Sequence, residues 1–191
     1  MKDLHVTRRQ ILKGAGAAGV LGALGVPATA FAEDDEDGNR IYVFVCQSQA
    51  PAALGLAKPR IGMQGSGTFK PAAKHVNGGG SYVLFDFAAS APKPLVASGR
   101  WKARRFVSYD TKGLGSYGQI QPGILVMTAD FEGIGKNRTL AVVCNVGAVP
   151  LNTGEDEGFE LSGTPYGTFH QLSPPVGISH LSVEGFRIGG D

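Results

Sequence analysis

The chain of 191 residues carries 18 Lys and Arg against 16 Asp and Glu, and its formal net charge is +2. Residues 1–32 hold four of the basic residues and one of the acids, so the remaining 159 residues carry 14 basic and 15 acidic side chains. A net charge near −1 removes any global electrostatic argument for nucleic acid or an anionic membrane as partner. Only local charge patterns can indicate a charged ligand.

The first 32 residues combine paired arginines, a short apolar run and a small-residue motif. Thr7-Arg8-Arg9-Gln10 precedes thirteen residues, 14–26, that are all Gly, Ala, Val or Leu, and Ala30-Phe31-Ala32 follows. A membrane-spanning helix needs roughly 20 apolar residues, so the run is too short for an anchor. The segment resembles a bacterial twin-arginine export signal. The resemblance implies that the export machinery binds Arg8 and Arg9, and that the chain is periplasmic or extracellular and not an integral membrane protein.

Beyond this segment, composition favours an all-β fold. The remaining residues include 24 Gly and 10 Pro, and no stretch of twelve or more keeps the 3.6-residue apolar period of a helix. Short runs rich in Val, Ile, Phe, Tyr and Thr lie between turn residues. We expect an acidic flexible N-terminus over 33–39 and one domain over 40–191. Its predicted architecture is an antiparallel β-sandwich of about eight or nine strands, with a closed β-barrel as the alternative.

The first half of this domain contains the following predicted elements. Residues 40–47 are apolar on both faces and predict a central strand, followed by a long loop over 48–60 with one helical turn at 52–57. Residues 61–70 predict a bulged strand, because three glycines interrupt them. Asn77-Gly78-Gly79-Gly80 predicts a hairpin turn into a strand over 81–88.

Residues 95–110 form the longest unbroken β pattern, and they carry a basic stripe. Alternation places Arg100, Lys102 and Arg104 on one face and Trp101 on the other. The pattern then breaks at Arg105, which a bulge or an ion pair with Asp86 would each explain. The stripe is the best sequence indication of a partner, such as an anionic cell-surface polymer, although a solvated strand face explains it too.

The second half predicts further strands at 123–131, 138–147, 158–161 and 168–172. A last strand carries Leu181 and Val183 out of step with Phe186 and Ile188, which predicts a bulge at Glu184-Gly185. Gly113-x-Gly115-x-x-Gly118 fits the dinucleotide-binding pattern, but turn residues and a strand follow it instead of a helix. We interpret this glycine pattern as a hairpin loop.

Candidate catalytic groups are sparse. Asp86 interrupts an apolar strand face, and an enzyme could use it with Tyr82 or Tyr109; a rim carboxylate bound to an arginine is the structural interpretation. The histidines lack metal-ligand spacing, Cys144 lacks the His and Met of a blue-copper loop, and no Gly-x-Ser-x-Gly elbow occurs. We therefore expect no metal or other cofactor.

Cys46 and Cys144 are the only cysteines, and each lies in an apolar strand pattern. Export to an oxidising compartment favours a single Cys46–Cys144 disulfide, with two unrelated buried thiols as the alternative.

The segments Trp101-Lys102-Ala103 and Val143-Cys144-Asn145-Val146-Gly147 resemble those of small secreted bacterial β proteins without an assigned function. That resemblance implies no catalytic residues. The leading functional hypothesis is an exported non-enzymatic binding or structural domain whose partner is an anionic polymer or a small ligand, not nucleic acid. The alternative is the small barrel enzyme that uses Asp86.

Overall fold

The computed structural model describes residues 39–89, 92–115, 120–146 and 152–183, and their regular structure is entirely β. The predicted all-β class is therefore confirmed. The nine strands are β1 (Arg40–Gln49), β2 (Pro59–Lys70), β3 (His75–Asp86), β4 (Leu95–Asp110), β5 (Gly123–Phe131), β6 (Gly135–Cys144), β7 (Gly158–Thr164), β8 (Gly167–Gln171) and β9 (Gly177–Val183).

The strands close into an eight-stranded antiparallel barrel. Each strand from β1 to β8 pairs with the next, and the end of β1 pairs with β8 through Ser48–Gln171 and Gln49–His170. The rest of the same β1 edge pairs with β9. Of the two predicted architectures, the structure has the closed barrel and not the sandwich, because pairing of β1 with both β2 and β8 leaves neither end of the eight-strand series as a free edge.

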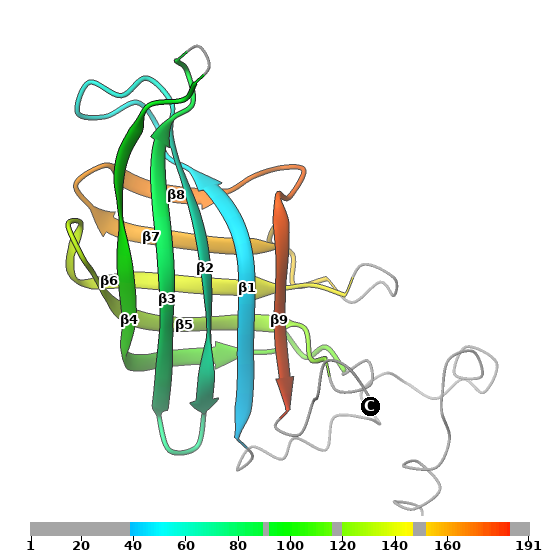
Figure 1. Ribbon diagram of the computed structural model, residues 1–191. Coiled ribbons are helices and arrows are strands. Elements are labelled where there is room, and N and C mark those ends of the chain that lie inside the picture. The colour runs from blue at the N-terminus through cyan, green and yellow to red at the C-terminus, as the bar shows by residue number, and fades with distance from the viewer. Residues whose placement is uncertain (1–38, 90–91, 116–119, 147–151, 184–191) are drawn as a thin grey trace, which may run out of the picture.

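The barrel has two walls whose strands run across each other. Figure 1 shows β9, β1, β2, β3 and the first part of β4 side by side, with β5 to β8 crossing behind them. β4 turns the corner between the walls, and its pairing with β5 shifts register between Ala103 and Arg105 and again between Phe106 and Ser108. The bulge predicted at this position is present, and it leaves Arg105 exposed.

Aromatic side chains fill the barrel interior. Phe44 of β1 lies 5.8 Å, between ring centroids, from both Trp101 of β4 and Phe159 of β7, and Trp101 stacks on Phe131 of β5 at 6.0 Å. All four are almost completely buried. The centre of the barrel is therefore a packed core, as expected of a small barrel.

Paired glycines make room for two of the largest side chains. Gly65 pairs with Gly80 and Gly67 pairs with Gly78 across β2 and β3. The indole of Trp101 occupies the space that a side chain on Gly65 would take, and its Nε1 donates to the carbonyl of Gln64 at 3.0 Å. The phenol of Tyr42 fills the same kind of space over the second pair, and its hydroxyl donates to the carbonyl of Asn77 at 3.3 Å.

This packing overturns the predicted turn at residues 77–80. These residues lie inside β3, because the inward-facing glycines among them serve the core. The chain reverses instead at Pro71–Lys74, where the amide of Lys74 donates to the carbonyl of Pro71 at 3.0 Å. The expected helical turn at 52–57 is also absent: Ala53 and Leu56 form a tight turn with two backbone hydrogen bonds. The acidic run 33–37 and the bulge at 184–185 lie outside the described residues.

Candidate functional site

The basic stripe of β4 lies on the outside of the barrel. Arg100, Lys102 and Arg104 are exposed, while Trp101 and Ala103 between them are buried. The pleat of the strand causes this alternation, because successive side chains point to opposite faces. The three cations therefore project from the same face of β4 into solvent.

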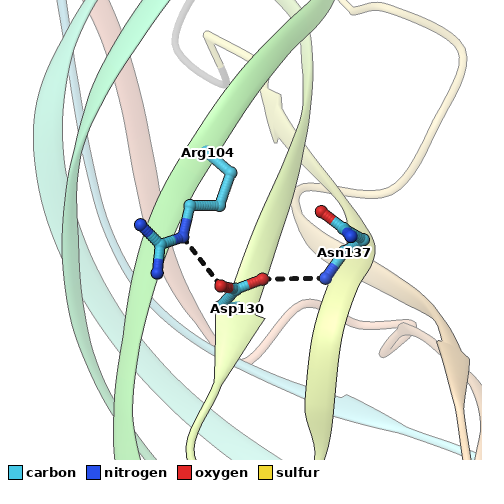
Figure 2. Close-up of polar contacts among 3 residues, drawn as sticks. All are labelled: Arg104, Asp130 and Asn137. Atoms are coloured by element: carbon cyan, nitrogen blue, oxygen red, sulfur yellow. Dashed lines mark hydrogen bonds and ion pairs between the residues drawn. The ribbon is translucent and has the colours of Figure 1, made fainter.

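Asp130 of β5 is the carboxylate that the stripe contacts (Figure 2). Its Oδ2 lies 2.8 Å from Nε of Arg104, and its Oδ1 accepts the backbone N–H of Asn137 at 2.8 Å. The Asn137 hydrogen bond, followed by Arg104, lowers the pKa of Asp130. Lys102 stands directly opposite Asp130 in the β4–β5 register but makes no ion pair in the described part of the chain. Asp130 therefore fixes the position of Arg104 without neutralising the stripe.

Two further cations extend the stripe into a larger patch. The bulge exposes Arg105 beside Arg104, and Lys136 of the β5–β6 hairpin is exposed close enough to Asp130 to lower its pKa. We call Arg100, Lys102, Arg104, Arg105 and Lys136 the basic face. Its acidic neighbours are Asp130 and Glu132, so positive charge remains in excess. Such a local excess attracts anions even though the whole domain is nearly neutral.

We call the wall of β9, β1, β2, β3 and the first part of β4 the front wall. An open groove lies on its outer face, over β1, β2 and β3. It has a volume of about 440 Å³, and its lining includes Val45, Gln47, Gly62, Gln64 and Val83 together with Val176, which precedes β9. A second hollow of about 240 Å³ adjoins it, shares Val45 and Gln64 with it, and continues over Gly79 and Gly80. The sequence did not indicate this groove. The apolar residues on both faces of β1 are the available signal, and that pattern predicts a central strand rather than a groove.

Asp86 lies at the rim of the barrel and binds backbone. Its carboxylate accepts the N–H groups of Lys58 at 2.9 Å, Ala88 at 3.1 Å and Ala57 at 3.3 Å, and the Lys58 hydrogen bond is the main cause that lowers its pKa. Its expected arginine partner, Arg105, points to solvent instead. Asp86 thus holds the 57–58 loop against the end of β3.

The two tyrosines considered with Asp86 are not beside it. Tyr82 is buried, and its hydroxyl donates to the carbonyl of Glu132. Tyr109 packs edge-on against Phe69, with ring centroids 5.0 Å apart, whereas Asp86 pairs with Pro59 at the other end of β2. Phe69 and Pro59 are ten residues apart, about 33 Å along an extended strand. The structure does not bring the three side chains into one site.

The predicted Cys46–Cys144 disulfide is wrong, since both cysteines are free and buried. β9 contacts both cysteine strands: Sγ of Cys46 donates to the carbonyl of Ile178 at 3.0 Å, and the hydroxyl of Ser179 donates to the carbonyl of Val143, next to Cys144. Burial raises the pKa of Cys46 to about 12 and that of Cys144 to about 11. Both thiols are therefore protonated, and poor nucleophiles, at neutral pH.

The other patterns considered in the sequence provide no site within the described residues. No group of three or more metal-ligating side chains occurs there. Nδ1 of His170 instead lies 2.9 Å from Oε2 of Glu160. The structure describes the glycine pattern at 113–118 only as far as residue 115. In that part a turn joins Thr111 to Leu114.

Comparison with known proteins bears on the N-terminus. Residues 5–25 match the family described as the TAT (twin-arginine translocation) pathway signal sequence. The chain carries an export signal. Comparison with curated proteins and with solved structures found no match, so the resemblance of the β domain to other secreted proteins is not supported. Among the described residues, no helix has the length and apolar character needed to cross a membrane.

Proposed function

We propose that this protein is an exported, non-enzymatic binding module that uses its basic face to hold an anionic polymer of the cell surface. The observation that carries the proposal is the exposed row Arg100, Lys102 and Arg104, of which only Arg104 is paired with a carboxylate in the described residues. A row of cations on a rigid strand matches the repeated charges of a polyanion, and each contact releases a counterion. The export signal supports the proposal, because an exported protein meets polymers that lie outside the cytoplasmic membrane.

The barrel interior supports binding rather than catalysis. Its centre is filled by Phe44, Trp101, Phe131 and Phe159, and the carboxylate considered for catalysis, Asp86, is occupied by three backbone N–H groups. An enzyme site needs convergent polar groups in a pocket that shields the reaction from water. The exposed surface of the front wall is the better candidate for function.

Binding of soluble polyphosphate tests the proposal, with polyglutamate as a second polyanion. The Arg100→Gln/Lys102→Gln protein should bind at least about tenfold more weakly at low salt, because two phosphate contacts are lost. The Lys70→Gln/Lys74→Gln protein removes the same charge at the β2–β3 hairpin and should bind like the wild type. The affinity of the wild type should also fall steeply with salt.

Two results would overturn the proposal. Equal losses in the two double variants would mean that only net charge matters and that the basic face has no special role. An absence of binding to either polymer at low salt would leave the stripe as a solubilising strand face.

A further inference from the structure

A chemically graded row of side chains crosses the front wall. Strand pairing aligns Ile178, Val45, Gln64, Ser81 and Arg100, one from each of β9, β1, β2, β3 and β4. Figure 1 shows these five strands side by side. Neighbouring strands lie roughly 4.8 Å apart, so the row spans about 19 Å from its aliphatic end to its cationic end.

The aliphatic end is unusually exposed for a folded domain. The exposed fractions of the side chains are 58% for Ile178, 56% for Val45, 42% for Val176 and 39% for Val83. Val45 stands opposite Ile178, and Val45, Val83 and Val176 line the groove. Covering exposed apolar surface is favourable in water, and a clustered exposed patch is a common mark of a binding site.

The middle of the row forms the floor of the groove. Gly62, two residues before Gln64 on β2, lines the groove without a side chain. Gln64 donates through Nε2 to the hydroxyl of Ser81 at 3.0 Å. The side chains of Gln64 and Ser81 are neutral, and the hydrogen bond between them already uses part of their hydrogen-bonding capacity. The floor can therefore carry an aliphatic chain without burying a charge.

The cationic end is Arg100. The carboxylate of Glu132 accepts the backbone N–H of Arg100 at 2.9 Å, and the guanidinium forms no ion pair within the described residues. An anion at this end would gain a charge-assisted hydrogen bond that the protein itself does not supply.

We propose that this wall binds a single-chain anionic amphiphile, with the aliphatic chain in the groove over Gly62 and the anionic group at Arg100. The proposal rests on the proposed function, since Arg100 belongs to the basic face, and it names the ligand as one with an apolar part. Charge complementarity selects this occupant. A second copy related by a twofold axis in the plane of the groove would place Arg100 against Arg100 of the other chain when the axis runs along the row, or against Ile178 when it runs across the row, and neither arrangement pairs the guanidinium with an anion. The polyanion alone would leave the valines exposed.

The groove volume agrees with this ligand class. Small-molecule sites are typically about 300–1,000 Å³, and the groove of about 440 Å³ lies within that range. Because the groove is open, the chain contributes affinity by covering valine side chains and not by complete enclosure. We therefore expect both the chain and the anion to be needed for binding.

Calorimetric titration of the exported protein with monododecyl phosphate, below its micelle concentration, tests the inference. Inorganic phosphate and dodecyl maltoside serve as the head-only and neutral-chain probes, and each should bind at least about tenfold more weakly. Arg100→Gln should reduce binding of dodecyl phosphate about tenfold and leave the weak binding of dodecyl maltoside unchanged.

Filling the groove is the decisive variant. A Cβ on Gly62 would meet Val83 Cγ2 at 3.5 Å, an ordinary contact, and Gly62 does not have a positive φ. Gly62→Leu should therefore fold, and it should weaken binding of dodecyl phosphate by at least about tenfold. Ser108→Leu, which adds the same side chain at an exposed position elsewhere on β4, should bind like the wild type.

The outcomes separate this inference from the proposed function. If polyphosphate binds but dodecyl phosphate binds no better than inorganic phosphate, the amphiphile proposal is wrong and the proposed polyanion binding is unaffected. If Ser108→Leu and Gly62→Leu weaken binding equally, the amphiphile has no specific site. If sedimentation shows a wild-type dimer that Gly62→Leu dissociates, the groove is a contact between copies and the inference is wrong.

Discussion

Trp101 of β4 lies across the glycine backbone of two neighbouring strands and reaches Gly65 of β2. The two residues belong to one inward-facing row, in which Phe44, Gly65, Gly80 and Trp101 pair in turn from β1 to β4. Because neither glycine has a side chain, the rings of Phe44 and Trp101 meet above them at 5.8 Å. Three residues of this row, Phe44, Gly65 and Gly80, also line the second hollow, which adjoins the groove.

Gly65→Ala should therefore destabilise the protein. A methyl group there would overlap Cζ2 of Trp101, and overpacking of a core typically costs about 1–3 kcal/mol. Gly62→Ala is the matched control on the same strand, since its Cβ faces the open groove, and its effect should stay within about 0.5 kcal/mol. Urea unfolding followed by tryptophan fluorescence measures both. Equal effects would mean that the glycine row is not what positions Trp101.

The same row shows where sequence patterns lose their predictive power. Asn77-Gly78-Gly79-Gly80 is typical of a turn, and local chemistry alone favours that interpretation. The glycines are instead required by Tyr42 and Trp101, which come from strands distant in the sequence. Alternation in β4 was predictable from Arg100 to Arg104, because this part of the strand keeps one register up to the bulge.

Part of the candidate site was predictable for the same reason. Arg100, Lys102 and Arg104 belong to one strand, so their shared face follows from the pleat. The groove was not predictable, because Val45, Val83 and Val176 meet only through the pairing of β1 with β2, of β2 with β3, and of β1 with β9. The disulfide failed on topology as well, since no pattern in the sequence indicates that β9 pairs with β1 and that the thiol of Cys46 donates to its backbone.

Replacement of both Arg8 and Arg9 by lysine should leave the precursor in the cytoplasm. The match over residues 5–25 identifies a twin-arginine signal, and its name reflects dependence on the arginine pair. Lys2→Arg/Lys13→Arg changes two other basic residues of the segment and should be exported. Immunoblots of cytoplasmic and exported fractions measure both variants. Normal export of the double-lysine protein would point to an ordinary secretory signal.

The exported protein should contain two free thiols. Cys46 and Cys144 are both buried and unpaired, and burial raises the pKa of each, so a thiol reagent should react slowly with the native protein at pH 8. Denaturant without reductant should release two reactive thiols per chain. A count of zero with a monomeric mass would restore the disulfide and contradict the placement of β9.

Asp86→Asn should lower the melting temperature without changing the affinity for polyphosphate. The folded pKa of Asp86 is lowered, chiefly by the N–H of Lys58, so its contribution is present above the unfolded pKa near 4 and disappears as pH falls. The difference in melting temperature between wild type and variant should therefore vanish in acid. A loss of polyphosphate binding in Asp86→Asn would instead place the binding site at this rim.

Alkaline pH should destabilise the fold through its buried thiols. The ordinary pKa of a cysteine thiol is 9.0. Burial raises the pKa of Cys46 to about 12 and the pKa of Cys144 to about 11. Between these values the unfolded chain loses protons that the folded chain keeps, so the free energy of unfolding falls as pH rises. The stability that the two protonated thiols contribute is fully present below about pH 9. It is lost as the pH rises from 9 through the pKa values of the folded protein.

The urea midpoint, measured with reductant present, should therefore decrease from pH 8 to pH 10.5. The Cys46→Ala/Cys144→Ala protein will be less stable overall because of the atoms removed from the core, but its midpoint should depend less on pH across this range. Tyr42→Phe should keep most of the pH dependence, since the unfolded chain loses the Tyr42 proton only near its usual pKa of 10.0, above the 9.0 at which the thiols begin to contribute. An unchanged slope in the protein without cysteines would assign the alkaline effect to other groups.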